Sequence, residues 1–181
     1  MMFAAILLSL PSCIAYGASA NDQRNEILNM RKDTLARLYK VHPSARAHIK
    51  SAAGYAVFSN IGVNLVFLSA AGGSGVAHNN QSGKDIYMKM ISGGVGIGLG
   101  VKDFRGVFVF SDREAFKRFA KSGWEANAQA DAAAKSGHKG GAATGAITVA
   151  PGVSLYQLTE NGLALQATIQ GTKYYKNDNL N

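Results

Sequence analysis

The sequence is poor in residues that constrain or charge a chain: it has one cysteine, three prolines and no charged residue among its first 20 positions. A single cysteine excludes an intramolecular disulfide, and the scarcity of proline excludes a proline-rich disordered segment. The chain has 181 residues, of which 47% are hydrophobic and 17% charged. This balance is typical of one globular domain with a sizeable core.

Motifs for catalysis and for cofactors are also missing. The glycines between Gly94 and Gly100 follow a G-x-G-x-G-x-G pattern instead of the G-x-G-x-x-G of dinucleotide sites, and no Walker loop is present. Ser74 lacks the second glycine of a nucleophile elbow. The four histidines are dispersed and no cysteine pair accompanies them. We therefore expect no enzyme, no cofactor, no metal site and no nucleic-acid partner.

Residues 1–20 are typical of an export signal, because the apolar run from Phe3 to Leu10 is too short to span a membrane. Two processing sites compete. Cleavage after Ala18-Ser19-Ala20 would leave one domain at 21–181. Leu10-Pro11-Ser12-Cys13 instead resembles a lipobox, in which Cys13 would carry the lipid. We expect an exported protein, located in the periplasm or at the outer membrane, or alternatively secreted.

Basic residues exceed acidic ones by 19 to 11, so the formal net charge is +8 and an anionic partner is favoured. Residues 21–50 hold seven basic and three acidic residues, so this segment carries half of the net positive charge. Between 21 and 41 the apolar residues fall on one side of a helix, which Asn21 or Asp22 would cap. This helix could bind a membrane surface or pack on the rest of the domain. Arg31 falls in its apolar half and needs either a protein partner or lipid phosphates.

From Gly54 onward the sequence alternates between strand-forming residues and glycine. The alternation of Gly94 to Val101 places four glycines on one strand face, which favours a curved sheet over a ligand cradle. Ser111 and Glu114 predict a capping box for a helix near 112–121, and Asn161-Gly162 predicts a hairpin. Residues 124–134 fit helix or strand, and 173–181 read as a polar tail.

The predicted fold class is α+β, with an N-terminal amphipathic helix or helices packed on a glycine-rich, strongly curved, mainly antiparallel sheet or barrel. The order of the motifs resembles the SYLF family of lipid-binding domains from about Leu35 to Asn181. The residues that carry the resemblance are Gly54, Tyr55, Phe58, Gly73, Gly75, Gly94, Gly96, Gly98, Gly100, Gly162 and Gly171. The resemblance implies phospholipid binding through a basic N-terminal helix, and yeast relatives are also described as actin-binding.

We therefore expect a non-enzymatic domain of the cell envelope that binds anionic phospholipid at a membrane surface. The candidate lipid-binding residues are Arg24, Arg31, Lys32, Arg37, Lys40, Arg113, Lys117, Arg118 and Lys121. Cys13 is the candidate lipidation site. The alternative is a protein-interaction or structural module of the envelope without specific lipid binding. The sequence does not indicate an oligomeric state.

Overall fold

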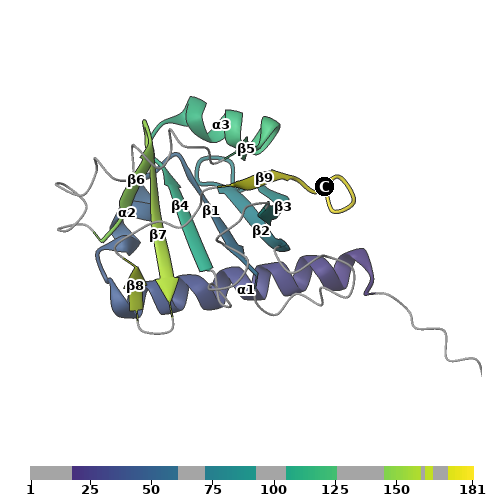
Figure 1. Ribbon diagram of the computed structural model, residues 1–181, viewed down its shortest axis with the longest axis horizontal. Helices are drawn as coiled ribbons and strands as arrows, with labels where there is room; N and C mark the ends of the chain where they lie inside the picture. The colour runs from purple at the N-terminus through teal and green to yellow at the C-terminus, as the bar shows by residue number, and fades with distance from the viewer. Residues whose placement is uncertain (1–17, 61–71, 93–104, 126–144, 160–161, 165–170) are drawn as a thin grey trace, which may run out of the picture.

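The computed structural model describes residues 18–60, 72–92, 105–125, 145–159, 162–164 and 171–181 (Figure 1). Its helices are α1 (Ala20–Val41), α2 (Ala45–Ser51) and α3 (Arg113–Ser122). Its strands are β1 (Gly54–Ser59), β2 (Gly72–Asn79), β3 (Asp85–Ser92), β4 (Arg105–Phe110), β5 (Trp124–Glu125), β6 (Ile147–Ala150), β7 (Val153–Thr159), β8 (Gly162–Ala164) and β9 (Thr172–Lys176). The predictions for Cys13, for Gly94 to Gly100 and for residues 126–134 lie outside the described residues.

The nine strands form one sheet in the order β5-β9-β3-β2-β1-β4-β7-β6, and β8 pairs with β7. Every neighbouring pair is antiparallel. The sheet curls strongly between the helices (Figure 1). The expected α+β class with a curved, mainly antiparallel sheet is therefore confirmed.

The helices α1 and α3 cover opposite faces of this sheet. Because successive side chains in a strand point to opposite faces, Ala56 and Phe58 of β1 join the core under α3. Val57, between them, joins the core under α1 and α2. In Figure 1 the sheet accordingly lies between α3 above and α1 below.

Gly75 makes room for the central aromatic side chain of the α3 face. Phe58 is fully buried, and its partners across the sheet are Gly75 on β2 and Gly106 on β4. A Cβ atom at Gly75 would overlap the Phe58 ring and lie 2.5 Å from the carbonyl oxygen of Val57. Position 75 therefore requires glycine, because the Phe58 ring occupies the space that a side chain at this position would need.

The helix caps differ from those expected. Ser19, not Asn21 or Asp22, caps α1: its hydroxyl accepts from the Asp22 N–H, and the Asp22 carboxylate accepts from the Ser19 N–H. Ser19 belongs to the predicted cleavage site, so processing after Ala20 would remove this cap. At α3 the cap is Asp112, not Ser111; its carboxylate accepts two backbone N–H bonds, which lower its pKa. An ionised acceptor binds these donors more strongly than a hydroxyl does.

The prediction of a polar tail at 173–181 was wrong, because these residues belong to the fold. β9 lies between β3 and β5, and the side chain of Tyr174 is buried among the rings of the α3 face. Leu180 packs with Ile27 of α1. The amide of Asn181 bonds to both backbone groups of Tyr87, donating to its carbonyl at 2.8 Å and accepting from its N–H at 3.0 Å. A side chain thus continues the strand pairing at this position.

Candidate functional site: a basic groove beside α3

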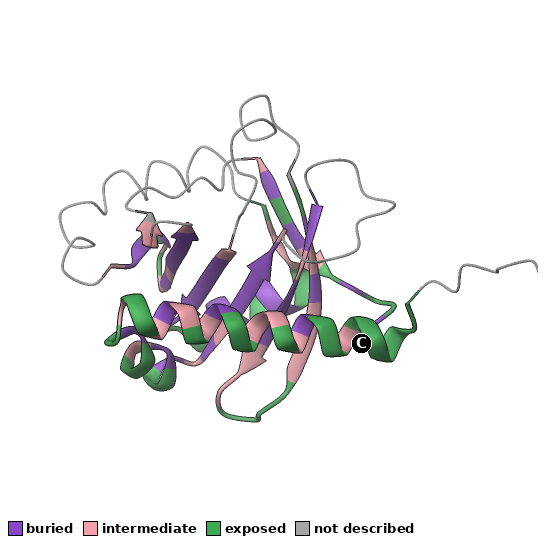
Figure 2. Ribbon diagram, turned by 90° about the horizontal axis from the view of Figure 1, so that it is seen from below, coloured by how far each residue is buried: buried purple, intermediate pink, exposed green. Residues whose placement is uncertain are grey.

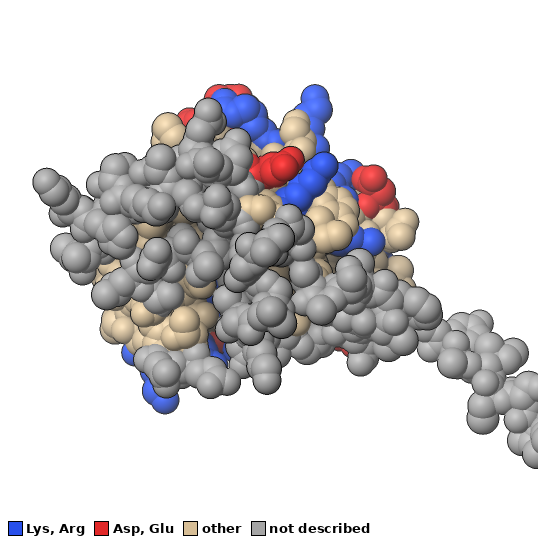
Figure 3. All heavy atoms as spheres, in the orientation of Figure 1, with Lys and Arg blue, Asp and Glu red and all other residues tan. Residues whose placement is uncertain are grey.

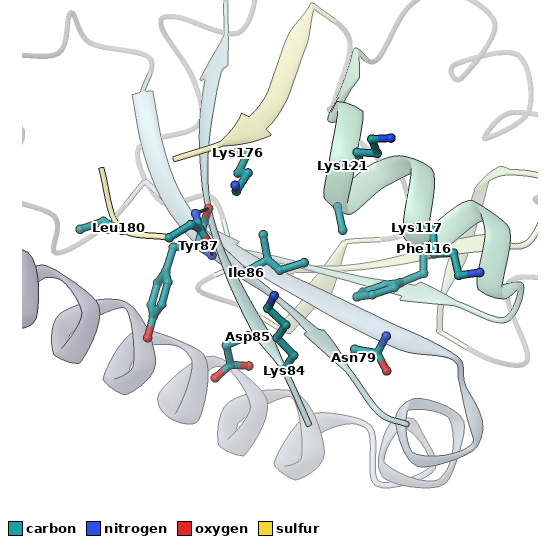
Figure 4. A pocket seen from close by; sticks show the side chains of 12 residues that line it. Asn79, Lys84, Asp85, Ile86, Tyr87, Phe116, Lys117, Lys121, Lys176 and Leu180 are labelled. Carbon is teal, nitrogen blue, oxygen red and sulfur yellow. Dashed lines mark hydrogen bonds between the residues drawn. The ribbon is translucent and has the colours of Figure 1, made fainter. Parts of the chain in front are cut away.

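A groove of about 730 Å³ lies between α3, β3 and the C-terminal residues (Figure 4). Four lysines from three separate segments of the chain line it. Lys84 precedes β3, Lys117 and Lys121 come from α3, and Lys176 ends β9. Lys117 and Lys121 are among the candidate residues of the sequence analysis, whereas Lys84 and Lys176 were missed. Their local sequences, a polar turn and the presumed tail, carry no signal of a site.

The floor of the groove is apolar. Phe116 and Ala120 come from one side of α3, and Ile86 comes from β3. Phe116 is held in place by an edge-on contact with Phe110, whose ring centroid lies 5.6 Å away. The backbone of β1 lies against the Phe116 ring, as shown by the distance of only 2.6 Å between this ring and a Cβ atom built at Gly54. The floor is therefore preformed by core packing.

Strand alternation separates the groove from the surface under α1. Ile86 points into the groove, while its neighbours Asp85 and Tyr87 point toward α1 (Figure 4). The Asp85 carboxylate accepts from Arg31 of α1 at 2.7 Å, and the same oxygen lies 2.7 Å from Nδ1 of His78. The acidic group that lines the groove is therefore paired on the other face of the sheet.

The lysines differ in their partners. Lys117 pairs with Glu114 at 2.8 Å, and Lys176 approaches Asp178 at 3.7 Å. The two lysines and the two carboxylates of these pairs are largely exposed. Such exposed pairs contribute little and exchange readily with water or a ligand. Within the described part of the chain, Lys84 and Lys121 form no ion pair. The rim of the groove thus presents two lysines, Lys84 and Lys121, whose charge is not paired with a carboxylate among the described residues.

The apolar side of α1 packs on the sheet, which was one of the two interpretations of this helix. Leu38 is fully buried and Ile27 is 4% exposed. Figure 2, seen from the side of α1, shows its buried and half-buried residues interspersed with exposed ones. No helix in the described ranges combines the length and apolarity needed to cross a membrane.

Three candidate lipid-binding arginines of α1 have partners inside the protein. Arg24 donates to the carbonyl of Leu180 at 2.9 Å, Arg31 pairs with Asp85, and Arg37 donates to the carbonyl of Thr159 at 2.8 Å. The partner that Arg31 required is therefore a carboxylate of the same chain. Lys32 and Lys40 are exposed.

The four candidate residues of α3, Arg113, Lys117, Arg118 and Lys121, are all exposed. In Figure 3 basic side chains, with a few acidic ones between them, gather over α3 along the upper edge of the molecule. Since α1 and α3 cover opposite faces of the sheet, the two basic clusters predicted from the sequence do not form one surface. The structure instead brings Lys117 and Lys121 of the α3 cluster together with Lys84 and Lys176, whereas Arg118 lines a separate pocket.

A second polar cluster, under α2, is structural. Nδ1 of His48 lies 2.9 Å from the hydroxyl of Tyr156, which is buried in the core. Burial lowers the pKa of His48 and raises the pKa of Tyr156. In the described residues, no three His, Cys, Asp or Glu side chains are grouped closely enough to hold a metal ion.

The fold and the groove together define an α+β domain with a curved antiparallel sheet and a basic groove that has an apolar floor. No family model matches the chain. It is similar to the protein named Beta cell expansion factor A from Aeromonas veronii, with 36% identity over 162 residues. The match covers 90% of this chain and 60% of that protein, so the chain spans less than two thirds of the relative's length.

Proposed function

We propose that this chain is a non-enzymatic domain of an exported cell-envelope protein, and that it binds anionic phospholipid at a membrane surface. The observation that carries the proposal is the concentration of exposed basic side chains on α3 and around the neighbouring groove. A basic residue near an anionic bilayer contributes about 1 kcal/mol to binding. The resemblance of the sequence to the SYLF family, including the alternating glycines from Gly94 to Gly100, points to the same ligand.

The proposal assigns different roles to the two helices. The apolar side of α1 is occupied by the sheet, and Arg24, Arg31 and Arg37 have protein partners. Arg31 is paired with a carboxylate, and Arg24 and Arg37 are held against backbone carbonyls, so the exposed cations of this helix are Lys32 and Lys40. The four candidate basic residues of α3 are all exposed. We place the main membrane-facing surface at α3 and a weaker contribution at Lys32 and Lys40.

Co-sedimentation with vesicles of phosphatidylglycerol, compared with phosphatidylcholine at low salt, tests the proposal. The variant Arg113→Glu/Arg118→Glu reverses two exposed charges on α3 outside the groove lysines. Loss of two basic contacts lowers the partition coefficient by about 30-fold, and charge reversal lowers it at least as much. Lys32→Glu/Lys40→Glu changes the net charge equally on the opposite face of the sheet and serves as the control.

The proposal requires that phosphatidylglycerol vesicles bind the protein and that the α3 variant loses more binding than the α1 variant. A larger loss in the α1 variant would move the binding surface to the N-terminal helix. Equal sedimentation with both lipids would exclude selective binding of anionic phospholipid. In that case the alternative, an interaction or structural module of the envelope, would be supported by a specific protein partner recovered by cross-linking in intact cells.

A further inference from the structure

We propose that the groove beside α3 binds one molecule of a single-chain anionic amphiphile, with its chain on the apolar floor and its head group at the lysines. This goes beyond attachment to a membrane surface, because it requires no bilayer. The inference rests on the groove itself: its size, its floor, its charge and the elements that hold it open.

The size and preformation of the groove suit a small ligand. Its volume of about 730 Å³ lies within the range of about 300–1,000 Å³ typical of ligand pockets. Phe116 is 2% exposed and Ala120 is 5% exposed, so their backbone and rotamers are set by the core. At the other end, Leu180 and Asn181 are anchored to β3 and α1. A ligand would therefore meet walls that are already in place, which limits the entropic cost of binding.

The apolar floor of the groove is bordered by lysines. Ile86 lies in the middle of the groove, with Lys84 and Lys176 on its two sides and Phe116 facing it from α3 (Figure 4). Apolar surface is thus bordered by cations on more than one side. An acyl chain that lies on the half-buried Ile86, against the wall that Phe116 forms, removes apolar surface from water, whereas a second acyl chain beside it would cover the ammonium groups. The arrangement therefore favours a ligand with one acyl chain.

The charge of the rim selects the head group. The lining contains four lysines and one acidic residue, Asp85, whose carboxylate points to the other face of the sheet and is paired with Arg31. Among the described residues Lys84 and Lys121 have no ion pair and can donate to a ligand, and Lys117 and Lys176 form only exposed pairs. Hydrogen bonds from ammonium groups to a carboxylate or phosphate are stronger than those to a neutral acceptor. A zwitterionic or neutral head group would gain less.

Equilibrium titration of the full chain with cis-parinaric acid, a fluorescent single-chain carboxylate used below its aggregation concentration, tests this site. We expect one molecule of cis-parinaric acid to bind per protein molecule. Oleate and lysophosphatidic acid should displace it, which compares a carboxylate with a phosphate head group. Lysophosphatidylcholine, which has a chain but no net charge, should displace it at least about tenfold more weakly, since one charged hydrogen bond is worth about that factor or more.

Three variants separate the site from general surface charge. Lys84→Gln/Lys121→Gln should weaken binding at least about tenfold, whereas Lys32→Gln/Lys40→Gln, with the same loss of charge on α1, should leave it unchanged. Ile86→Trp places a large ring on the half-buried floor and should reduce the number of molecules bound. Far-UV circular dichroism and the unfolding midpoint establish that each variant is folded.

The site is overturned if cis-parinaric acid does not bind, if the two double variants weaken binding equally, or if folded Ile86→Trp binds normally. Failure here is distinct from failure of the proposed function. A chain that sediments with phosphatidylglycerol vesicles and ignores monomeric amphiphile lacks the groove site but retains the membrane surface. A chain that binds the amphiphile with the expected variants and ignores vesicles has the groove site alone.

Discussion

Replacing Arg31 by glutamine should destabilise the domain without removing a membrane contact, because this side chain attaches α1 to the sheet. Its guanidinium lies 2.7 Å from the Asp85 carboxylate, and the two side chains are 21% and 24% exposed. Hydrogen bonds to charged groups contribute about 1.5–3 kcal/mol when buried, and fully exposed pairs contribute about 0.2–1 kcal/mol. For this half-buried pair we expect a loss of about 1–2 kcal/mol in the free energy of unfolding.

The matched control is the neighbouring residue. Lys32→Gln removes the same charge from an exposed position of the same helix turn and should change stability by less than about 0.5 kcal/mol. Urea unfolding followed by far-UV circular dichroism measures both. Asp85→Asn completes a double-mutant cycle, in which the coupling energy between positions 31 and 85 isolates the pair. The amide keeps the size of the carboxylate and removes its charge.

Equal stability of the Arg31→Gln and Lys32→Gln proteins would refute the reasoning, as would zero coupling between positions 31 and 85. Either result would mean that Arg31 does not depend on Asp85 in solution. Its role at a bilayer surface would then be open again. If the pair forms as the structure has it, Arg31→Gln should reduce vesicle binding no more than Lys32→Gln does.

Three further predictions concern the core and its pH dependence. Gly75→Val should lower stability by about 1–3 kcal/mol or prevent folding, because its side chain would overlap the Phe58 ring; thermal unfolding measures the loss. Leu180→Ala, at a position 2% exposed, should cost about 2–5 kcal/mol in urea unfolding, whereas Val41→Ala, at a position 43% exposed, should cost far less. Burial lowers the pKa of His48 in the folded state, so the unfolded chain binds its proton more readily. Stability should therefore fall as the pH is lowered below about 6.5, and His48→Gln should flatten that part of a urea-midpoint profile. A steeper profile in His48→Gln would contradict the assignment.

Much of the local structure follows from patterns within short stretches. The 3.6-residue period between positions 21 and 41 corresponds to α1, and the valine and phenylalanine run before Ser111 corresponds to β4. The errors occur where an element depends on distant residues. Thr172–Lys176 has few apolar residues and reads as a tail, yet it becomes β9 because β3 and β5 offer backbone partners on both sides. Tyr174, which is buried in the structure, is the residue of this segment that would have suggested a strand and not a tail.

The candidate site shows the same division. The basic character of α3 is a property of its own sequence, because residues three and four apart share a helix face. The groove is not, since Lys84, Lys121 and Lys176 meet only after β9 has paired with β3 and α3 has packed over Phe58 and Phe110. No spacing along the chain encodes that meeting.

Composition and periodicity alone predict a small α+β domain with excess positive charge, an amphipathic N-terminal helix and strands rich in glycine and aromatic residues. The charge follows from the residue count, and the helix and strand periods follow from interactions between near neighbours in the chain. The faces on which the helices lie, and the partners of their charges, depend on strand order. Arg31 and Asp85 are 54 positions apart, and only the pairing of β3 with β2 beneath α1 brings them to 2.7 Å. The tertiary structure thus converts one arginine from a candidate lipid ligand into an internal tether, and assembles four scattered lysines into one groove.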